Sequence, residues 1–221
     1  MYLNLYYIQY VFLFIALLFS IWGVSGKTYK SDLRFFPVFL LIMLAVELTA
    51  VYLSNQNRHN TFIYNLEAVF EFGFYLFFLQ RVNSRYTNTK PLNFLIPAFL
   101  GLYLVNIFYF QGREVFNTYT FILGCVFVIV LCIQYFILIV KVSPKFIYWR
   151  EPIFWIVLGL LFYHSMMLPF FGIINYFETR PNISQILLFI PLVYNSILYL
   201  MFIMAFIFNK KGKVERSGLR P

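Results

Sequence analysis

Seven long apolar segments, separated by short polar stretches, occupy almost the whole chain. Each holds about 20 mostly apolar residues, the length that a helix needs to cross a ~30 Å hydrocarbon core. The segments lack the strict apolar–polar alternation of membrane β-barrel strands. We therefore predict an all-α, polytopic transmembrane bundle of seven helices. The predicted spans cover residues 6–24, 35–54, 61–80, 92–110, 118–140, 152–174 and 184–208.

The stretches between the spans are too short to hold a soluble domain. Residues 1–208 are thus predicted to form a single transmembrane domain, and residues 209–221 a basic cytoplasmic tail. Pro97, Pro169 and Pro191 fall inside predicted spans. Because proline removes a helical hydrogen bond and crowds the preceding turn, we expect it to kink or unwind each of these helices.

The composition supports a membrane protein. Hydrophobic residues make up 62% of the chain and charged residues 11%, against roughly 45–50% and about 25% in soluble domains. A water-soluble fold could not cover so much apolar surface with polar groups. Intrinsic disorder is excluded as well, because disordered chains contain few apolar residues and many charges.

The basic residues predict how the bundle is oriented. All but three of the 17 Lys and Arg residues lie in the first, third and fifth loops and in the tail. The second, fourth and sixth loops carry one each: Arg58, Arg113 and Arg180. Because cytoplasmic loops are enriched in Lys and Arg, the N-terminus is predicted to lie outside and the C-terminus in the cytoplasm. The net charge of +9 therefore reflects topology, and no nucleic-acid partner is expected.

Four ionisable residues lie inside the predicted spans: Glu47, Glu67, Glu71 and His164. A charge at the bilayer centre costs at least ~2.5–3.5 kcal/mol on insertion scales, so such residues usually face the bundle interior and have partners. The predicted topology places all four in one layer, from the midplane to the outer half. Asn106, Tyr194 and Asn195 fall near the same depth.

Tyr64, Glu67, Glu71 and Tyr75 recur every three or four residues and so share one helical face. Two carboxyls one turn apart in a low dielectric cannot both stay ionised at low cost, and at least one should hold its proton. His164 is the natural partner for them. The candidate site for a ligand or proton thus comprises Glu47, Tyr64, Glu67, Glu71, Asn106, His164, Tyr194 and Asn195. The alternative is that these side chains only join helices, at ~0.6 kcal/mol per pair.

No catalytic motif is present in the sequence. The phosphate-binding loop, the H-E-x-x-H zinc motif and the G-x-S-x-G nucleophile elbow are all absent. His164 and the glutamates have ligand types that a divalent metal accepts, but the chain has only two histidines. We therefore expect no catalytic residues, no metal and no cofactor, and the sequence favours a non-enzyme.

Four functions fit these features: a receptor-like or sensory protein that binds a small ligand, a small proton- or cation-coupled transporter, an intramembrane enzyme acting on lipid, and a structural subunit of a larger complex. The outer polar layer and the basic cytoplasmic face favour the first. Besides the lipid bilayer, the expected partners are a membrane or cytoplasmic signalling protein, and a homo-oligomer remains open. The expected location is the cell membrane, by default the bacterial inner membrane.

Overall fold

The computed structural model describes residues 3–25, 31–56, 58–142, 148–177 and 189–217. The regular structure of these residues is helical and includes no β-strand, which confirms the all-α prediction. The long helices of this part of the chain are α1 (Leu3–Val24), α2 (Phe36–Asn55), α3 (Thr61–Asn83), α4 (Leu92–Val105), α5 (Thr118–Val142), α6 (Pro152–Phe177) and α8 (Phe189–Ser217). Three short turns accompany them: η1 (Ser31–Phe35), the π-helical η2 (Asn106–Phe110) that prolongs α4, and η3 (Tyr148–Arg150).

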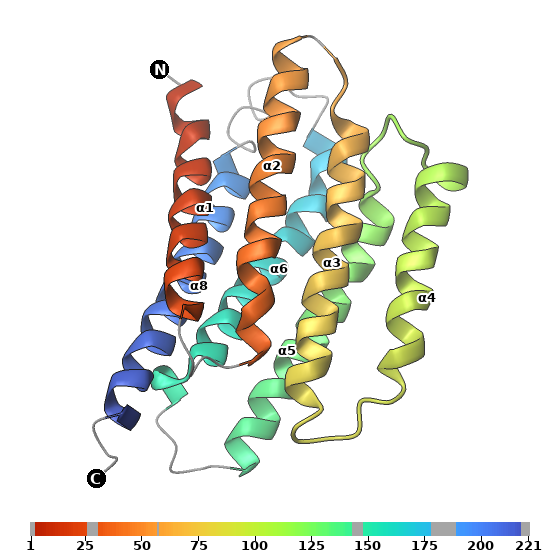
Figure 1. Ribbon diagram of the computed structural model, residues 1–221. Helices are drawn as coiled ribbons and strands as arrows, with labels where there is room; N and C mark the ends of the chain where they lie inside the picture. The colour runs from red at the N-terminus through yellow and green to blue at the C-terminus, as the bar shows by residue number, and fades with distance from the viewer. Residues whose placement is uncertain (1–2, 26–30, 57, 143–147, 178–188, 218–221) are drawn as a thin grey trace.

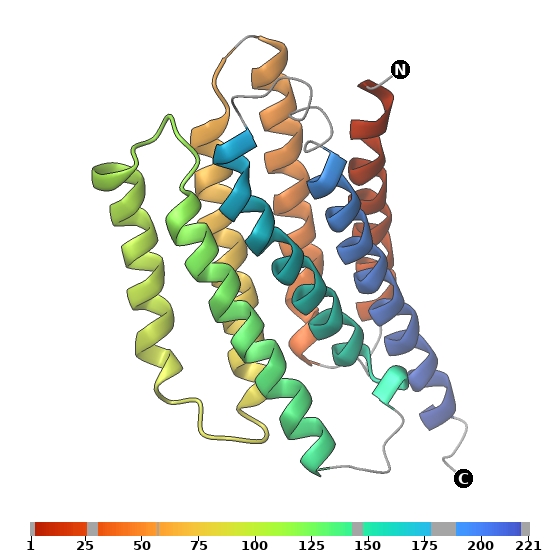
Figure 2. The same ribbon diagram turned by 180° about the vertical axis from the view of Figure 1, so that it is seen from behind.

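The seven long helices run alternately up and down between two ends of one bundle (Figure 1). The first turn of α1 lies at one end and the last turn of α8 at the other, and we call these the N-terminal end and the C-terminal end. Helix α8 packs against α1 on one side and α6 on the other, while α5 lies between α6 and α3. Helix α4 lies at the periphery and packs mainly against α3 (Figure 2).

Six helices among the described residues are long and apolar enough to cross a membrane. They are α2 with η1, α3, α4 with η2, α5, α6 and α8. In α1 the apolar stretch is the shorter Ile8–Val24, although the whole helix has 22 residues and is therefore about 33 Å long. The fold is thus that of a multi-pass membrane protein. The seventh crossing and the side that each end faces remain predictions.

The last helix differs most from its prediction. The predicted span 184–208 begins outside the described residues, and α8 continues to Ser217, well into the predicted tail. Lys, Arg and Glu are good helix formers, so a polar composition alone does not end a helix. Pro191 is the third residue of α8 as described, and the part of the predicted span before Phe189 lies outside the described residues, so the kink expected there stays a prediction. Pro97 and Pro169 do lie inside helices.

Aromatic rings fill the half of the bundle nearest the C-terminal end. The ring of Phe36, at the start of α2, contacts Phe74 and Phe78 of α3 and Phe202 and Phe206 of α8, with centroid distances of 5.0, 5.2, 5.4 and 5.9 Å. All are edge-to-face contacts, which add about 0.5–1.5 kcal/mol each to the gain from burial. We call these five residues the Phe36 cluster. The cluster closes the core below the site described next.

Candidate functional site

A cavity of about 360 Å³ lies in the half of the bundle nearest the N-terminal end. Its walls come from α1, α2, α3, α6, α8 and the start of α5. Five of the residues predicted from the sequence line it: Glu47, Tyr64, Glu67, Glu71 and Asn195. The structure therefore brings all three intramembrane carboxyls together around one space.

The carboxyls reach the cavity from two neighbouring helices. Glu67 and Glu71 are one turn apart on α3, and Tyr64 precedes them on the same face. Glu47 projects from α2, close enough to Glu67 and Glu71 to interact with both electrostatically. Among the described residues that line the cavity, none is Lys, Arg or His. The ionisable groups of this described wall are thus carboxyls, together with the phenols of its tyrosines.

The three glutamates differ in their hydrogen bonds. The Tyr75 hydroxyl, one turn further along α3, donates a hydrogen bond to the Glu71 carboxyl. In contrast, Oε2 of Glu47 is buried and has no hydrogen-bond partner. Leaving a buried polar group unpaired costs roughly 1–3 kcal/mol. A ligand that donated a hydrogen bond to Glu47 would remove this cost.

An amide pair closes the wall between the first and last helices. Nδ2 of Asn195, on α8, donates a hydrogen bond to Oε1 of Gln9, on α1, across 3.3 Å. Both residues line the cavity. The neighbouring Tyr194 is not a lining residue, and its ring contacts Phe162 of α6 with a centroid distance of 6.2 Å. The sequence predicted both residues for the site, but only Asn195 lines the cavity.

His164 lies outside the cavity, in an aromatic environment. The side chain is 1% exposed, and its ring contacts those of Phe72, Tyr75 and Tyr163 at 5.7, 5.7 and 5.0 Å. Its Nδ1 lies 2.8 Å from the carbonyl oxygen of Leu160. Because a carbonyl can only accept, Nδ1 carries a proton and donates it. The hydrogen bond described for His164 is thus made within its own helix, and not with the glutamates that the sequence predicted as its partners.

Asn106 also lies away from the lining. Its Nδ2 donates to Oε1 of Gln111 at 2.7 Å and to Oγ1 of Thr120 at 3.0 Å. These bonds tie η2, the end of the fourth helix, to the start of α5. In the structure, Asn106 therefore holds η2 against α5. The sequence had predicted it for the candidate site only because it falls near the same depth as the glutamates.

Several residues that line the cavity were not predicted from the sequence. Gln9 is an amide in an apolar segment, a signal that could have been used. Tyr163 and Tyr199 belong to helices rich in aromatic residues and give no such signal. The same holds for Phe116, Phe121 and Phe171, whose rings pack together in the cavity wall with centroid distances of 5.4, 4.9 and 4.5 Å.

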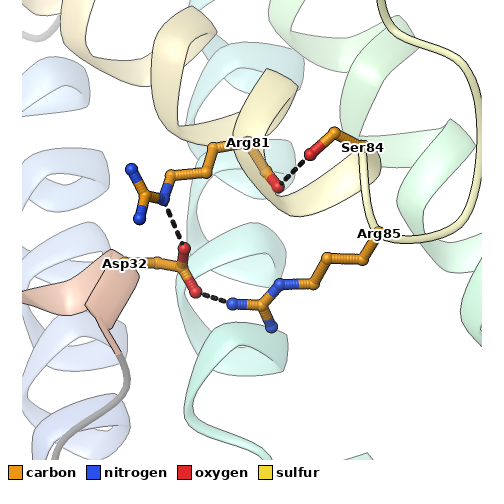
Figure 3. A network of polar contacts seen from close by, with 4 residues as sticks. All are labelled: Asp32, Arg81, Ser84 and Arg85. Atoms are coloured by element: carbon orange, nitrogen blue, oxygen red, sulfur yellow. Dashed lines mark hydrogen bonds and ion pairs between the residues drawn. The ribbon is translucent and has the colours of Figure 1, made fainter.

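A second polar cluster lies at the opposite end of the bundle (Figure 3). Asp32, in η1, has a side chain that is only 2% exposed. It accepts a hydrogen bond from Nε of Arg81 at 2.8 Å and another from Nη2 of Arg85. Arg81 lies in the last turn of α3, and Arg85 lies in the turn that follows the helix. The cluster therefore ties the start of α2 to the end of α3.

Comparisons of the chain with protein-family models, with curated proteins and with solved structures find no match. Among the described residues, no group of three or more His, Cys, Asp or Glu side chains could hold a metal ion. With no match, only the structure itself indicates the class of protein. The bundle of long apolar helices is compatible with an integral membrane protein.

Proposed function

We propose that this integral membrane protein is receptor-like, and that it binds a small ligand in the cavity near its N-terminal end. The observation that carries the proposal is the convergence of Glu47, Glu67 and Glu71 on one space of about 360 Å³. This volume falls within the range of about 300–1,000 Å³ typical of ligand sites. Helices that needed only to be joined would gain as much from Ser or Asn, without the cost of buried carboxyls.

The position of the cavity favours binding over transport. A transporter needs a path from its site to both ends, and buried carboxyls are common in such paths. Here the Phe36 cluster packs edge to face between α2, α3 and α8 in the other half of the bundle. Moving a substrate through it would require several ring contacts to open. For this reason we rank proton- or cation-coupled transport second, after ligand binding.

Helix α8 offers a route from the site to a partner. Its first turns contribute Leu192, Asn195 and Tyr199 to the cavity wall. The same helix continues to Ser217, and at the C-terminal end of the bundle it extends further than its neighbours α1 and α6. We propose that ligand binding is reported along α8 to a membrane or cytoplasmic signalling partner. By the distribution of basic loops, the cavity then faces the outside of the cell membrane.

The test is a search for ligands by thermal shift, using protein purified in detergent and small molecules of positive, negative and zero charge. A ligand that binds only the folded state raises the melting temperature in proportion to RT ln(1 + [L]/Kd). A hit should lose its effect in Ala68→Phe, because Ala68 is buried and lines the cavity. The matched control is Ala45→Phe, at an exposed position of α2.

Hydrogen exchange of the wild-type protein makes the test independent of whether Ala68→Phe folds. A bound ligand should protect the cavity-lining turns of α3, α6 and α8, and leave α4 unchanged. Protection elsewhere would contradict the proposal. If no compound of any charge binds, and loss of the carboxyls abolishes folding without a partner protein, the structural-subunit alternative replaces it. Substrate uptake by vesicles containing the protein would establish the transporter.

A further inference from the structure

We infer that the ligand of this cavity is a small amphipathic organic cation, with an ammonium group at one end and an apolar body at the other. The inference rests on the proposed function and names its ligand class. It depends on three separate properties of the wall: the sign of its charge, an unpaired acceptor and a cluster of aromatic rings.

The first property is the sign of the charge. Glu47, Glu67 and Glu71 line the cavity, and none of the other described lining residues is basic. Of the two described arginines in the loops at this end, Arg58 is exposed. Arg113 is exposed as well, with its guanidinium over the rings of Phe62 and Phe108. Among the described residues, an anion in the cavity would therefore meet only like charge, while a cation would neutralise a carboxylate that desolvation otherwise penalises.

The second property is the unpaired acceptor. Oε2 of Glu47 is buried and has no donor, whereas the Glu71 carboxyl already accepts from Tyr75. An ammonium group carries three N–H donors and no acceptor. It is therefore suited to a carboxylate with free lone pairs, and we place it beside Glu47. A hydrogen bond between two charged groups is roughly twice as strong as a neutral one.

The third property is the aromatic part of the wall. Phe116, in the loop before α5, and Phe121, in the first turn of α5, pack against Phe171 of α6 and against each other. These rings belong to other elements than the carboxyls, which come from α2 and α3. An apolar body would pack on the rings while the ammonium group reached Glu47. The rings add a cation–π attraction for any positive charge within about 6 Å of a face.

An inorganic ion would use only part of this wall. No three acidic, cysteine or histidine side chains among the described residues are arranged to hold a metal. A bare ion would also leave the rings of Phe116, Phe121 and Phe171 without a partner. A proton would neutralise a carboxyl but would not occupy the cavity of about 360 Å³. The organic cation accounts for the carboxyls, the unpaired acceptor and the rings together.

The experiment measures the affinity of matched probes by isothermal titration calorimetry in detergent. Each set shares one apolar body and differs only in its polar group: 2-phenylethylamine, 2-phenylethanol and 3-phenylpropionate, with equivalent sets built on cyclohexyl and n-hexyl bodies. We expect the amine to bind about tenfold or more tightly than its alcohol, since hydrogen bonds to charged groups exceed neutral ones. The carboxylates should not bind.

A pair of variants then locates the ammonium group. Glu47→Gln should remove the preference for amine over alcohol while alcohol binding changes little, because the apolar wall is intact. Glu114→Gln, at an exposed position in the loop before α5, is the matched control and should retain the full preference. If Glu47→Gln does not fold, the wild-type probe sets alone still decide the sign of the ligand.

Four outcomes overturn the inference. If every alcohol binds as tightly as its amine, or the carboxylates bind best, the cavity is a ligand site for another class and the proposed function stands. If Na⁺, K⁺ or Ca²⁺ alone binds in a Glu47-dependent manner, the ligand is an inorganic ion. If the preference for amines survives Glu47→Gln, the ammonium group lies elsewhere. If no probe and no library compound binds, the inference and the proposed function fail together.

Discussion

Gly159 of α6 lies directly against Met201 of α8: a Cβ atom added to the glycine would sit 2.8 Å from the Cβ of Met201. Neither atom is the end of a flexible side chain, so neither can move without its backbone. The two helices can pack this closely only because position 159 has no side chain. Small residues commonly permit such approaches between membrane helices.

Gly159→Ala should therefore destabilise the protein. Overpacking a tight contact costs typically about 1–3 kcal/mol, which thermal melting in one detergent can resolve. The matched control is Gly101→Ala in α4, where an added Cβ would meet nothing within 4 Å. That variant should be neutral or slightly more stable, because alanine favours helix over glycine. Equal melting temperatures for the two variants would contradict the close packing of α6 and α8.

Asp32→Asn should weaken the tie between η1 and α3. The buried carboxylate is the shared acceptor for Arg81 and Arg85, and hydrogen bonds to charged groups contribute about 1.5–3 kcal/mol. We expect a loss of about 1–3 kcal/mol in the free energy of unfolding, because the half-exposed arginines can rehydrate. Arg81→Gln should cost less, since Arg85 still pairs with Asp32. A larger loss for Arg81→Gln than for Asp32→Asn would refute the shared-acceptor arrangement.

Asn65→Leu should loosen the loop that carries Phe116 to the cavity. Asn65, at 0% exposure, donates to the carbonyl oxygen of Val115 at 2.9 Å and accepts from the backbone N–H of Asn117 at 3.0 Å. Leucine offers neither bond and leaves both backbone groups unpaired, at about 1–3 kcal/mol each. The measurement is hydrogen exchange at residues 115–117, which should accelerate relative to wild type. Unchanged exchange there would show that the loop holds without Asn65.

Glu67→Gln should stabilise the protein when no ligand is bound. Glu67 is a carboxyl beside Glu47 and Glu71 in the cavity wall, and glutamine removes first the cost of desolvating it and second its repulsion with its neighbours. Single stabilising substitutions commonly add about 0.5–2 kcal/mol to the free energy of unfolding. Glu114→Gln, on the exposed loop, should stay within about 0.5 kcal/mol of wild type. A destabilised Glu67→Gln would mean that the carboxylate has a structural partner.

The helices were largely predictable because apolar runs of membrane length have few other structures available. The shared wall of Glu67 and Glu71 was predictable as well, since residues four apart lie on one helical face. Where each helix ends was harder to predict. The continuation of α8 to Ser217 depends on helix propensity in a polar segment, and a hydropathy pattern does not record it.

The sequence indicates which helix carries a residue, but not the direction in which its side chain points. His164 and Asn106 were predicted for the site, yet His164 packs among rings and Asn106 bonds to Thr120. Rotation of a helix about its axis is set by ridges and grooves that meet only in the folded bundle. For the same reason, contacts between helices could not be predicted from the sequence. Examples are the approach of Glu47 to α3 and the packing of the rings of Phe116, Phe121 and Phe171.

Because α8 is one continuous helix, a small tilt at its first turns becomes a larger displacement at its far end. From Pro191 to Lys210 the helix extends about 28 Å at 1.5 Å per residue, and its first turns line the cavity. A tilt of about 5° around those turns would displace the far end by roughly 2.5 Å, slightly more than the shift of about 1–2 Å that interface helices make in known allosteric transitions. A ligand confined to the cavity near the N-terminal end would thus move the C-terminal end of α8 by a distance sufficient to change its contacts with a partner.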